Sequence, residues 1–412
     1  MERHPDVASQ LVEVIDEQYL RGDQQLSTVI SSLIRSVRSR LRMEVGFISE
    51  FSDDQRIFRF VDCGRDADIV AQNSCGPLED SFCEMIADGR LSQLVPDTRS
   101  SGEMDMVPEF ASIPVASHVS VPVELSDGST YGTFCVFSRY SMPSLNNRSL
   151  TMVRVFADVI ASLIEDSRSS QSQAQARREY IMQLLDEDKL MLYAQPVYSL
   201  ASDQIEGYEL LSRVSDDIEL SPAEIFLDAE RLGLSSLIGM RVLDKAREAL
   251  AALPAHHYVA INVTPSFLMD VDMTTWFEPA DRDRIVLEIT EHDAISDYIG
   301  LQERLAPLRK AGMRLAIDDA GAGYASFRHI LMLGPDVVKL DMSLIRDIDC
   351  LPEKQALVAA LYSFALNQGY RLIAEGVETE PELKLLKQLS ISCGQGFLLS
   401  RPQPISTFSE CH

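Results

Sequence analysis

Two adjacent aspartates, Asp318 and Asp319, follow the apolar run Leu315–Ile317. The run is typical of a buried strand, and Gly321 and Gly323 allow the chain to turn tightly after it. Neighbouring strand residues point to opposite faces, so the two carboxylates can share one target only where the strand frays. Two like charges side by side stay ionised more easily when a cation lies between them. Considered alone, the pair is equally consistent with a solvent-exposed turn.

Further polar residues stand at or near the ends of other predicted strands. They are Glu209, Asn262, Glu288, Glu291, Lys339, Asp341, Glu375 and Gln395. Apart from one lysine these are oxygen donors, which select Mg²⁺ or Mn²⁺ rather than zinc. A shared aspartate can bridge two such ions, and a two-metal pair suits phosphodiester hydrolysis. The alternative of unrelated surface polar residues is plausible for any single position but not for the whole set.

The elements that must position these residues begin near Leu190, where strand patterns alternate with amphipathic helices. Strands are predicted at 191–195, 204–212, 257–263, 284–290, 313–318, 336–341, 370–375 and 391–397. Eight strands with helical crossovers predict an α/β (β/α)8 TIM-like barrel, whose chemistry lies at the carboxyl ends of the strands. Only Ser199–Asp203 separates the first two strands, so we expect one of the two to run antiparallel.

The first part of the chain has a different pattern. Residues 1–45 show helical periodicity, two strands flank the Asp53–Asp54 turn, and a short helix is predicted from Ser81 to Asp88. Two alternating segments then flank Asp127–Gly128, which indicates a hairpin. A helix from Asn146 to about Glu165 completes an α+β, sensor-like arrangement.

Composition limits the classes of function. The 412 residues carry a formal net charge of -26, which argues against a nucleic-acid polymer or a membrane surface as partner. The seven cysteines show no zinc spacing, and we expect reduced thiols in a cytoplasmic protein, because neither a signal peptide nor a membrane-spanning run is evident. The first lysine is Lys189, which suggests that two modules join before this point.

The barrel segment, about 187–408, resembles the EAL-type phosphodiesterases that hydrolyse cyclic di-GMP. The eponymous motif stands here as Glu209-Leu210-Leu211-Ser212-Arg213, with Leu210 in place of the usual alanine. The family's Asp-Phe-Gly-Thr-Gly-Tyr loop has Ala320 and Ala322 at its Phe and Thr positions.

The resemblance implies specific roles for residues of this sequence. Glu209, Asn262, Glu288 and Asp318 are expected to bind one metal ion, and Asp318, Asp319 and Glu375 to surround a second. Lys339 and Gln395 would orient the attacking water, with Glu375 also in the catalytic set, and Glu291 would anchor the loop after Asp319. The expected substrate-binding residues are Gln195, Arg213, Asp341 and Glu378.

The segment from about residue 24 to 166 resembles a GAF domain. The matching pieces are Leu78–Cys83, Val95–Thr98, Ser120–Val123 and Asp127–Cys135. The cyclic-nucleotide signature of such domains contains a lysine, which this segment lacks, so the ligand stays an unknown small-molecule or redox signal. We expect Cys83 to be a buried thiol and His118 an imidazole at a strand edge. The alternative is that a chromophore or a haem is attached at these two residues.

The expected organisation is therefore an N-terminal helical segment (1–23), a GAF-like domain (24–166), a helical linker (167–186) and an EAL phosphodiesterase domain (187–412). The expected activity is metal-dependent hydrolysis of cyclic di-GMP to linear pGpG, with two Mg²⁺ or Mn²⁺ ions and with regulation by the first domain. The alternative is a silent cyclic di-GMP receptor that signals through conformation. We further expect a homodimer in which two linkers pack through Ile181, Leu184 and Leu185.

Overall fold

A computed structural model describes residues 23–64, 69–102, 107–111, 113–215, 218–290, 295–321 and 325–409. Its backbone contacts divide the chain into two compact units, with the boundary between Ala174 and Gln175. Helix α5 (Asn147–Asp186) contributes residues to both. Within the described residues, no helix has both the length and the apolar character that a membrane span requires.

The first unit is built on a six-stranded antiparallel sheet in the order β3-β2-β1-β6-β5-β4. Its strands are β1 (Val45–Ser52), β2 (Gln55–Cys63), β3 (Cys75–Pro77), β4 (Leu94–Val95), β5 (Ser117–Glu124) and β6 (Thr130–Ser138). The helices are α2 (Asp23–Leu41), α3 (Phe82–Ala87), α4 (Thr98–Ser101) and the first part of α5, with a 3-10 turn at Pro108–Ala111.

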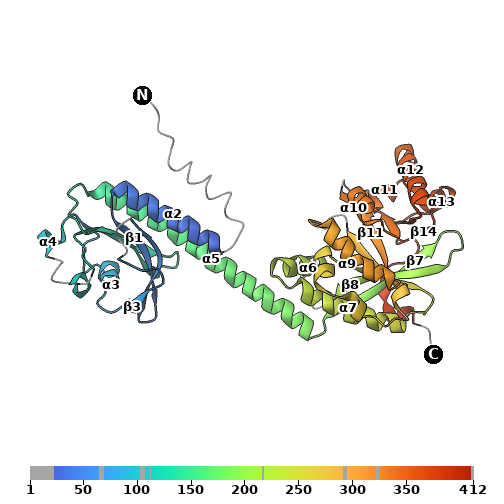
Figure 1. The fold of residues 1–412 in the computed structure, drawn as a ribbon, viewed down its shortest axis with the longest axis horizontal. Helices are drawn as coiled ribbons and strands as arrows, with labels where there is room; N and C mark the ends of the chain where they lie inside the picture. The colour runs from blue at the N-terminus through green and yellow to red at the C-terminus, as the bar shows by residue number, and fades with distance from the viewer. Residues whose placement is uncertain are drawn as a thin grey trace, which may run out of the picture. The chain divides into compact units, whose positions relative to one another are not determined.

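Two apolar clusters cover the two faces of this sheet. Alternate strand residues point to opposite faces, so Ile48 packs with α2 and α5 while Phe47 packs with α3. Helices α2 and α5 run side by side along one face (Figure 1). The helix-sheet-helix α+β arrangement predicted for this part of the chain is present.

The second unit is a closed barrel with the sheet order β14-β13-β12-β11-β10-β9-β8-β7-β15 and a β14–β7 pairing that completes the ring. Its strands are β7 (Leu190–Ser199), β8 (Ile205–Val214), β9 (Tyr258–Asn262), β10 (Ile285–Thr290), β11 (Arg314–Ala320), β12 (Val337–Leu340), β13 (Arg371–Ala374), β14 (Cys393–Gly394) and β15 (Gln403–Pro404). Strands β8 to β14 pair in parallel, whereas β7 is antiparallel to its neighbours β8 and β14. The predicted TIM-like barrel with one antiparallel strand is confirmed.

Helices follow the strands along the chain and form the outer layer (Figure 1). They are α6 (Pro222–Arg231), α7 (Ser235–Ala252), α8 (Pro265–Asp270), α9 (Tyr298–Lys310), α10 (Ala325–Leu333), α11 (Met342–Ile345), α12 (Pro352–Gln368) and α13 (Glu380–Gln388). Proline and a capping side chain mark the first turn of several of these helices. The Ser221 side chain accepts a hydrogen bond from Glu224 N at α6, and the Thr379 side chain accepts one from Glu382 N at α13.

The end of α5 packs into the barrel unit. Ile181, Leu184 and Leu185 are buried in the apolar cluster that also contains Leu190 and Leu243. The expectation that these three residues pack two linkers against each other in a dimer is therefore wrong. Their short apolar stripe is satisfied by the chain's own barrel, since a stripe of this length fits a helix docked on a core as well as a coiled coil.

Candidate active site

Strand periodicity places the candidate residues in one layer at the mouth of the barrel. An apolar layer fills the barrel interior, with one residue each from seven strands: Val197, Ala260, Val286, Ala316, Val337, Ile373 and Cys393. Side chains two positions apart on a strand share a face. Six of the seven strands lead to a polar residue two positions after their member of the apolar layer: Asn262, Glu288, Asp318, Lys339, Glu375 and Gln395. On the antiparallel strand β7, Gln195 comes two positions before Val197.

Lys339 is the centre of this polar layer. Its side chain is 1% exposed, and its Nζ lies 3.2 Å from carboxylate oxygens of Glu209, Glu288 and Asp318 and 2.8 Å from Glu375 Oε1. Four carboxylates thus face one ammonium group, which leaves an excess of negative charge whenever all four are ionised. Such an arrangement favours an added cation, because buried charge needs a partner.

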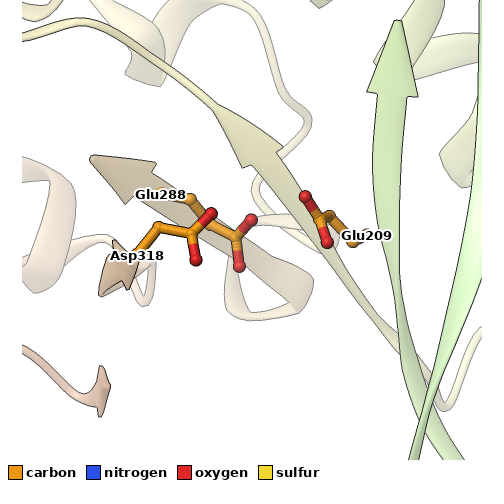
Figure 2. Close-up of side chains that lie close together, drawn as sticks. All are labelled: Glu209, Glu288 and Asp318. Atoms are coloured by element: carbon orange, nitrogen blue, oxygen red, sulfur yellow. The ribbon is translucent and has the colours of Figure 1, made fainter. Parts of the chain in front are cut away.

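Three of these carboxylates, from β8, β10 and β11, turn toward the same space between the strand ends (Figure 2). One oxygen each from Glu209, Glu288 and Asp318 lies within 4.8 Å of the others, and the same holds for Asp318, Asp319 and Glu375. Asp318 belongs to both groups. The two groups contain the carboxylates of the two ligand sets expected from the sequence. Asn262, the fourth residue expected in the first set, contacts this group through its Nδ2, which donates to Glu209 Oε1 at 3.2 Å.

Asp319 reaches the site by a local change in backbone conformation. Regular alternation would turn its side chain away from Asp318. The β11–β12 register shifts between Ile317 and Ala320, and Asp319 adopts a positive φ of 56°. Its N–H donates to Asp318 Oδ1 at 2.9 Å, and Gly321 follows with φ +114°. The conformation costs about 1 kcal/mol or more for a residue with a side chain, and Asp tolerates it better than most.

Electrostatics within the layer shift two carboxyl groups and the lysine. Burial raises the pKa of Glu288 and of Glu375 well above the usual value, because the attraction of Lys339 does not outweigh burial and the neighbouring carboxylates. Burial alone would lower the pKa of Lys339, but Asp318, Glu209, Glu288 and Glu375 together raise it. Lys339 therefore stays protonated and contributes charge rather than a base.

Gln395, which directly follows β14, lies against the carboxyl group of Glu209. Its Nε2 donates to Glu209 Oε2 at 2.7 Å, and its backbone N–H donates to Ala374 O. Its Oε1 is buried and lacks a hydrogen-bond partner among the described residues. An unsatisfied buried acceptor in a polar site calls for a water or another donor.

The four expected substrate-binding residues have local partners. Gln195 lies opposite Glu209 in the β7–β8 register, and its Nε2 donates to Ser400 O at 3.1 Å. Arg213 donates to Ser212 O, Asp341 caps α11 by accepting from Ser343 N, and exposed Glu378 lies 3.6 Å from Arg346. Glu291, expected to anchor the loop after Asp319, lies outside the described residues.

Glu382 was not expected from the sequence to matter for the site. Its buried carboxylate accepts hydrogen bonds from the backbone N–H groups of Asp347, Glu378 and Thr379. It thereby joins the loop after α11 to the loop that follows Glu375. The Thr379-x-x-Glu382 spacing, a capping-box pattern, is the sequence signal that predicts part of this arrangement.

Comparison with known proteins agrees with this geometry. The family model for the EAL domain matches residues 178–402, and the chain belongs to the EAL domain family. The chain is 30% identical over 241 residues to the cyclic di-GMP phosphodiesterase PdeF of Escherichia coli and 32% identical over 230 residues to the cyclic di-GMP phosphodiesterase PA2567 of Pseudomonas aeruginosa. These matches cover 56% and 52% of this chain but only 32% and 39% of the relatives.

A solved structure gives a similar result. The PaMucR phosphodiesterase in complex with c-di-GMP is 27% identical, with a TM-score of 0.50, and the match covers 56% of this chain and 98% of that one. The chain therefore shares with this structure the EAL fold of its second unit.

Proposed function

We propose that the barrel unit is a cyclic-guanylate-specific phosphodiesterase that hydrolyses cyclic di-GMP to linear pGpG with the aid of two divalent cations. The observation that carries this proposal is the convergence of Glu209, Glu288, Asp318 and Glu375 on Lys339 at the barrel mouth. The named activities of the relatives PdeF and PA2567, and the c-di-GMP complex of PaMucR, support the choice of substrate.

The donor set fits two Mg²⁺ or Mn²⁺ ions. Its members are carboxylate and amide oxygens, and Gln395 Oε1 is a buried acceptor that a water on an ion would satisfy. In the proposal Glu209, Asn262, Glu288 and Asp318 hold one ion, and Asp318, Asp319 and Glu375 hold the other. When bound, such ions neutralise phosphate charge and lower the pKa of a water.

The chain's own residues position the reactants. Lys339, fixed by four carboxylates, and Gln395, fixed on Glu209, orient the water that attacks phosphorus in line with the departing 3′ oxygen. Of the four carboxylates around Lys339, that of Glu375 lies nearest to Nζ, at 2.8 Å. In the proposal Glu375 therefore belongs to the catalytic residues together with Lys339. Gln195, Arg213, Asp341 and Glu378 contact the substrate, and Glu291 anchors the loop after Asp319.

The second candidate is a receptor that binds cyclic di-GMP without cleaving it. Leu210, Ala320 and Ala322, which depart from the family pattern, are the observations that favour it. The complete acidic set favours the enzyme. Purified protein incubated with cyclic di-GMP and Mg²⁺ or Mn²⁺, with bound ligand and product measured in the same samples, tests the proposal. Saturable binding without product contradicts hydrolysis and supports the receptor.

In this proposal the first unit is a GAF-like sensor in a cytoplasmic homodimer, and α5 carries its signal. A continuous helix transmits a shift at one end to the other. Four alanines inserted after Gln173 keep α5 helical and advance its downstream part by slightly more than one turn. A change in the rate of cyclic di-GMP hydrolysis or in the oligomeric state supports coupling. The same hydrolysis rate and the same oligomeric state in the insertion variant and the intact chain contradict it.

A further inference from the structure

Helix α11 packs against the loop that follows Asp319. Gly321 in this loop has a φ of +114°, and a Cβ at this position would collide with Leu344 Cδ1 of α11. Asp341, the residue before α11, donates its N–H to Ala320 O at 3.2 Å. One side of α11 is therefore in contact with the backbone that carries Asp319.

The same helix packs against the loop that carries Glu375. Gly376, the next residue, has a φ of +65°, and a Cβ there would lie 2.5 Å from Met342 Cβ of α11. The N–H of Glu375 donates at 3.0 Å to the carbonyl oxygen of Leu340, the last residue of β12. A displacement of α11 would therefore move Glu375 relative to Asp319.

Side chains from α12 and α13 hold this four-residue helix in place. A helix of this length is not stable by itself, because it forms too few hydrogen bonds to offset the cost of nucleation. Lys354 Nζ of α12 donates to Ser343 O at 2.5 Å and to Arg346 O at 2.7 Å. From α13, Glu382 Oε1 accepts a hydrogen bond at 3.0 Å from the N–H of Asp347, the second residue after α11. The position of α11 therefore depends on these two side chains.

The carboxylate of Glu382 joins α11 to the loop of Glu375. Glu382 is 3% exposed, and its Oε2 accepts from Glu378 N at 3.0 Å and from Thr379 N at 2.9 Å, while Oε1 is bonded to Asp347 N. Three N–H donors from two chain segments thus use both oxygens of one buried carboxylate. A glutamine side chain has a single acceptor oxygen, so it can satisfy one of the two segments but not both.

We propose that Glu382 is a positioning residue for the second divalent cation, because through α11 it fixes the separation of Asp319 and Glu375. This inference rests on the proposed function. It concerns the second cation alone, since the ligands expected for the first lie on the regularly paired strands β8 to β11. Asp319, in contrast, lies where the β11–β12 register shifts, and Glu375 lies just beyond the end of β13. Ligands that a strand ladder does not fix need support from their neighbours.

Manganese binding to the purified 412-residue chain, without substrate, tests this role. Titrations followed by electron paramagnetic resonance count the bound Mn²⁺ ions and give the Kd of each. We expect the unaltered chain to bind two ions. In Glu382→Gln one ion should keep its Kd and the other should bind at least about tenfold more weakly. Glu380→Gln, at an exposed position in the same turn of α13, removes the same charge and should leave both Kd values unchanged.

The outcomes of this titration distinguish the positioning role from the proposed function. If Glu382→Gln binds both ions as the unaltered chain does, or if both ions lose affinity equally, the positioning role is overturned and the two-cation function stands. If the unaltered chain binds fewer than two ions, the two-cation function is overturned and the positioning role with it.

Hydrogen exchange in the unaltered chain gives a result that does not depend on any variant folding. Residues 342–350 contain α11 and none of the expected metal ligands. Because coupling between two sites is reciprocal, Mg²⁺ should slow amide exchange in 342–350 at least about threefold more than in 244–252 of α7. An equal effect of Mg²⁺ on the two segments overturns the proposal.

Discussion

Lys339 Nζ lies 2.8 Å from Glu375 Oε1, and both groups belong to a layer with three further carboxylates around the same ammonium. Lys339 is the counter-ion for the carboxylates that β8, β10 and β11 and the residue after β13 bring together. Breaking such a buried arrangement by removing one partner leaves charge uncompensated.

Lys339→Gln is predicted to lower the metal-free stability of the barrel unit by about 3–5 kcal/mol. Mg²⁺ or Mn²⁺ should restore more stability in this variant than in the unaltered chain, because the ions then supply the only cations in the layer. Trp276, the single tryptophan, lies in the barrel unit and reports its urea unfolding by fluorescence. Lys310→Gln, at an exposed position of α9, is the control. If the metal ions shift the urea midpoint equally in the unaltered chain, Lys339→Gln and Lys310→Gln, the counter-ion role of Lys339 is contradicted.

Asp318→Asn is predicted to reduce turnover of cyclic di-GMP at least about a hundredfold, since this residue belongs to both carboxylate groups. Binding of the dinucleotide should persist through residues such as Arg213. The rate of product formation at saturating metal measures the loss, and Asp244→Asn, at a partly exposed position of α7, controls for the charge change. Turnover comparable to that of the control would rule out the shared role of Asp318.

Leu210→Ala is predicted to affect stability more than catalysis. Leu210 is 3% exposed and packs in the cluster between strands and helices, on the face of β8 opposite Glu209. Truncation of a buried leucine costs about 2–5 kcal/mol. The Trp276 unfolding midpoint should fall, while kcat changes by no more than about threefold if Glu209 keeps its position. A gain in kcat of orders of magnitude would instead indicate a chain that had drifted toward a receptor.

Glu382→Gln is predicted to remove a pH-dependent part of the stability. Burial acts to raise the pKa of Glu382, but hydrogen bonds from Asp347, Glu378 and Thr379 prevail and lower it below the ordinary 4.5. A lowered pKa stabilises the folded state above pH 4.5, and this contribution is lost as the pH falls through the folded-state value. The variant should be about 1–3 kcal/mol less stable near neutral pH, and the difference should shrink in acid.

Urea midpoints of the two proteins at neutral and acidic pH measure this difference. Glu353→Gln, in the exposed first turn of α12, is the matched control. A Glu382→Gln deficit that is the same at every pH would show that packing, not the charge of Glu382, provides the stability.

Much of the barrel, and the convergence of its polar residues, is predictable from the sequence. The alternation along each strand identifies its inward face, and the polar residue near the strand's end lies on that same face. Residues two positions beyond Val286, Ala316 and Val337 must share their inward face. The left-handed φ of Asp319 is not predictable in this way, since it depends on the register shift against β12. The burial of Ile181 and the three-way bonding of Glu382 depend on tertiary neighbours that a periodic pattern does not identify.

The most direct test of the proposed function is hydrolysis of cyclic di-GMP in water enriched in oxygen-18. The purified 412-residue chain, with Mg²⁺ or Mn²⁺, is incubated with the dinucleotide, and the products are separated and weighed by mass spectrometry. Attack of water on phosphorus predicts linear pGpG with one heavy oxygen in its terminal phosphate, and no product in the presence of excess chelator. Recovery of the intact cyclic dinucleotide from a chain that binds it and retains its metal ions would contradict the proposed activity.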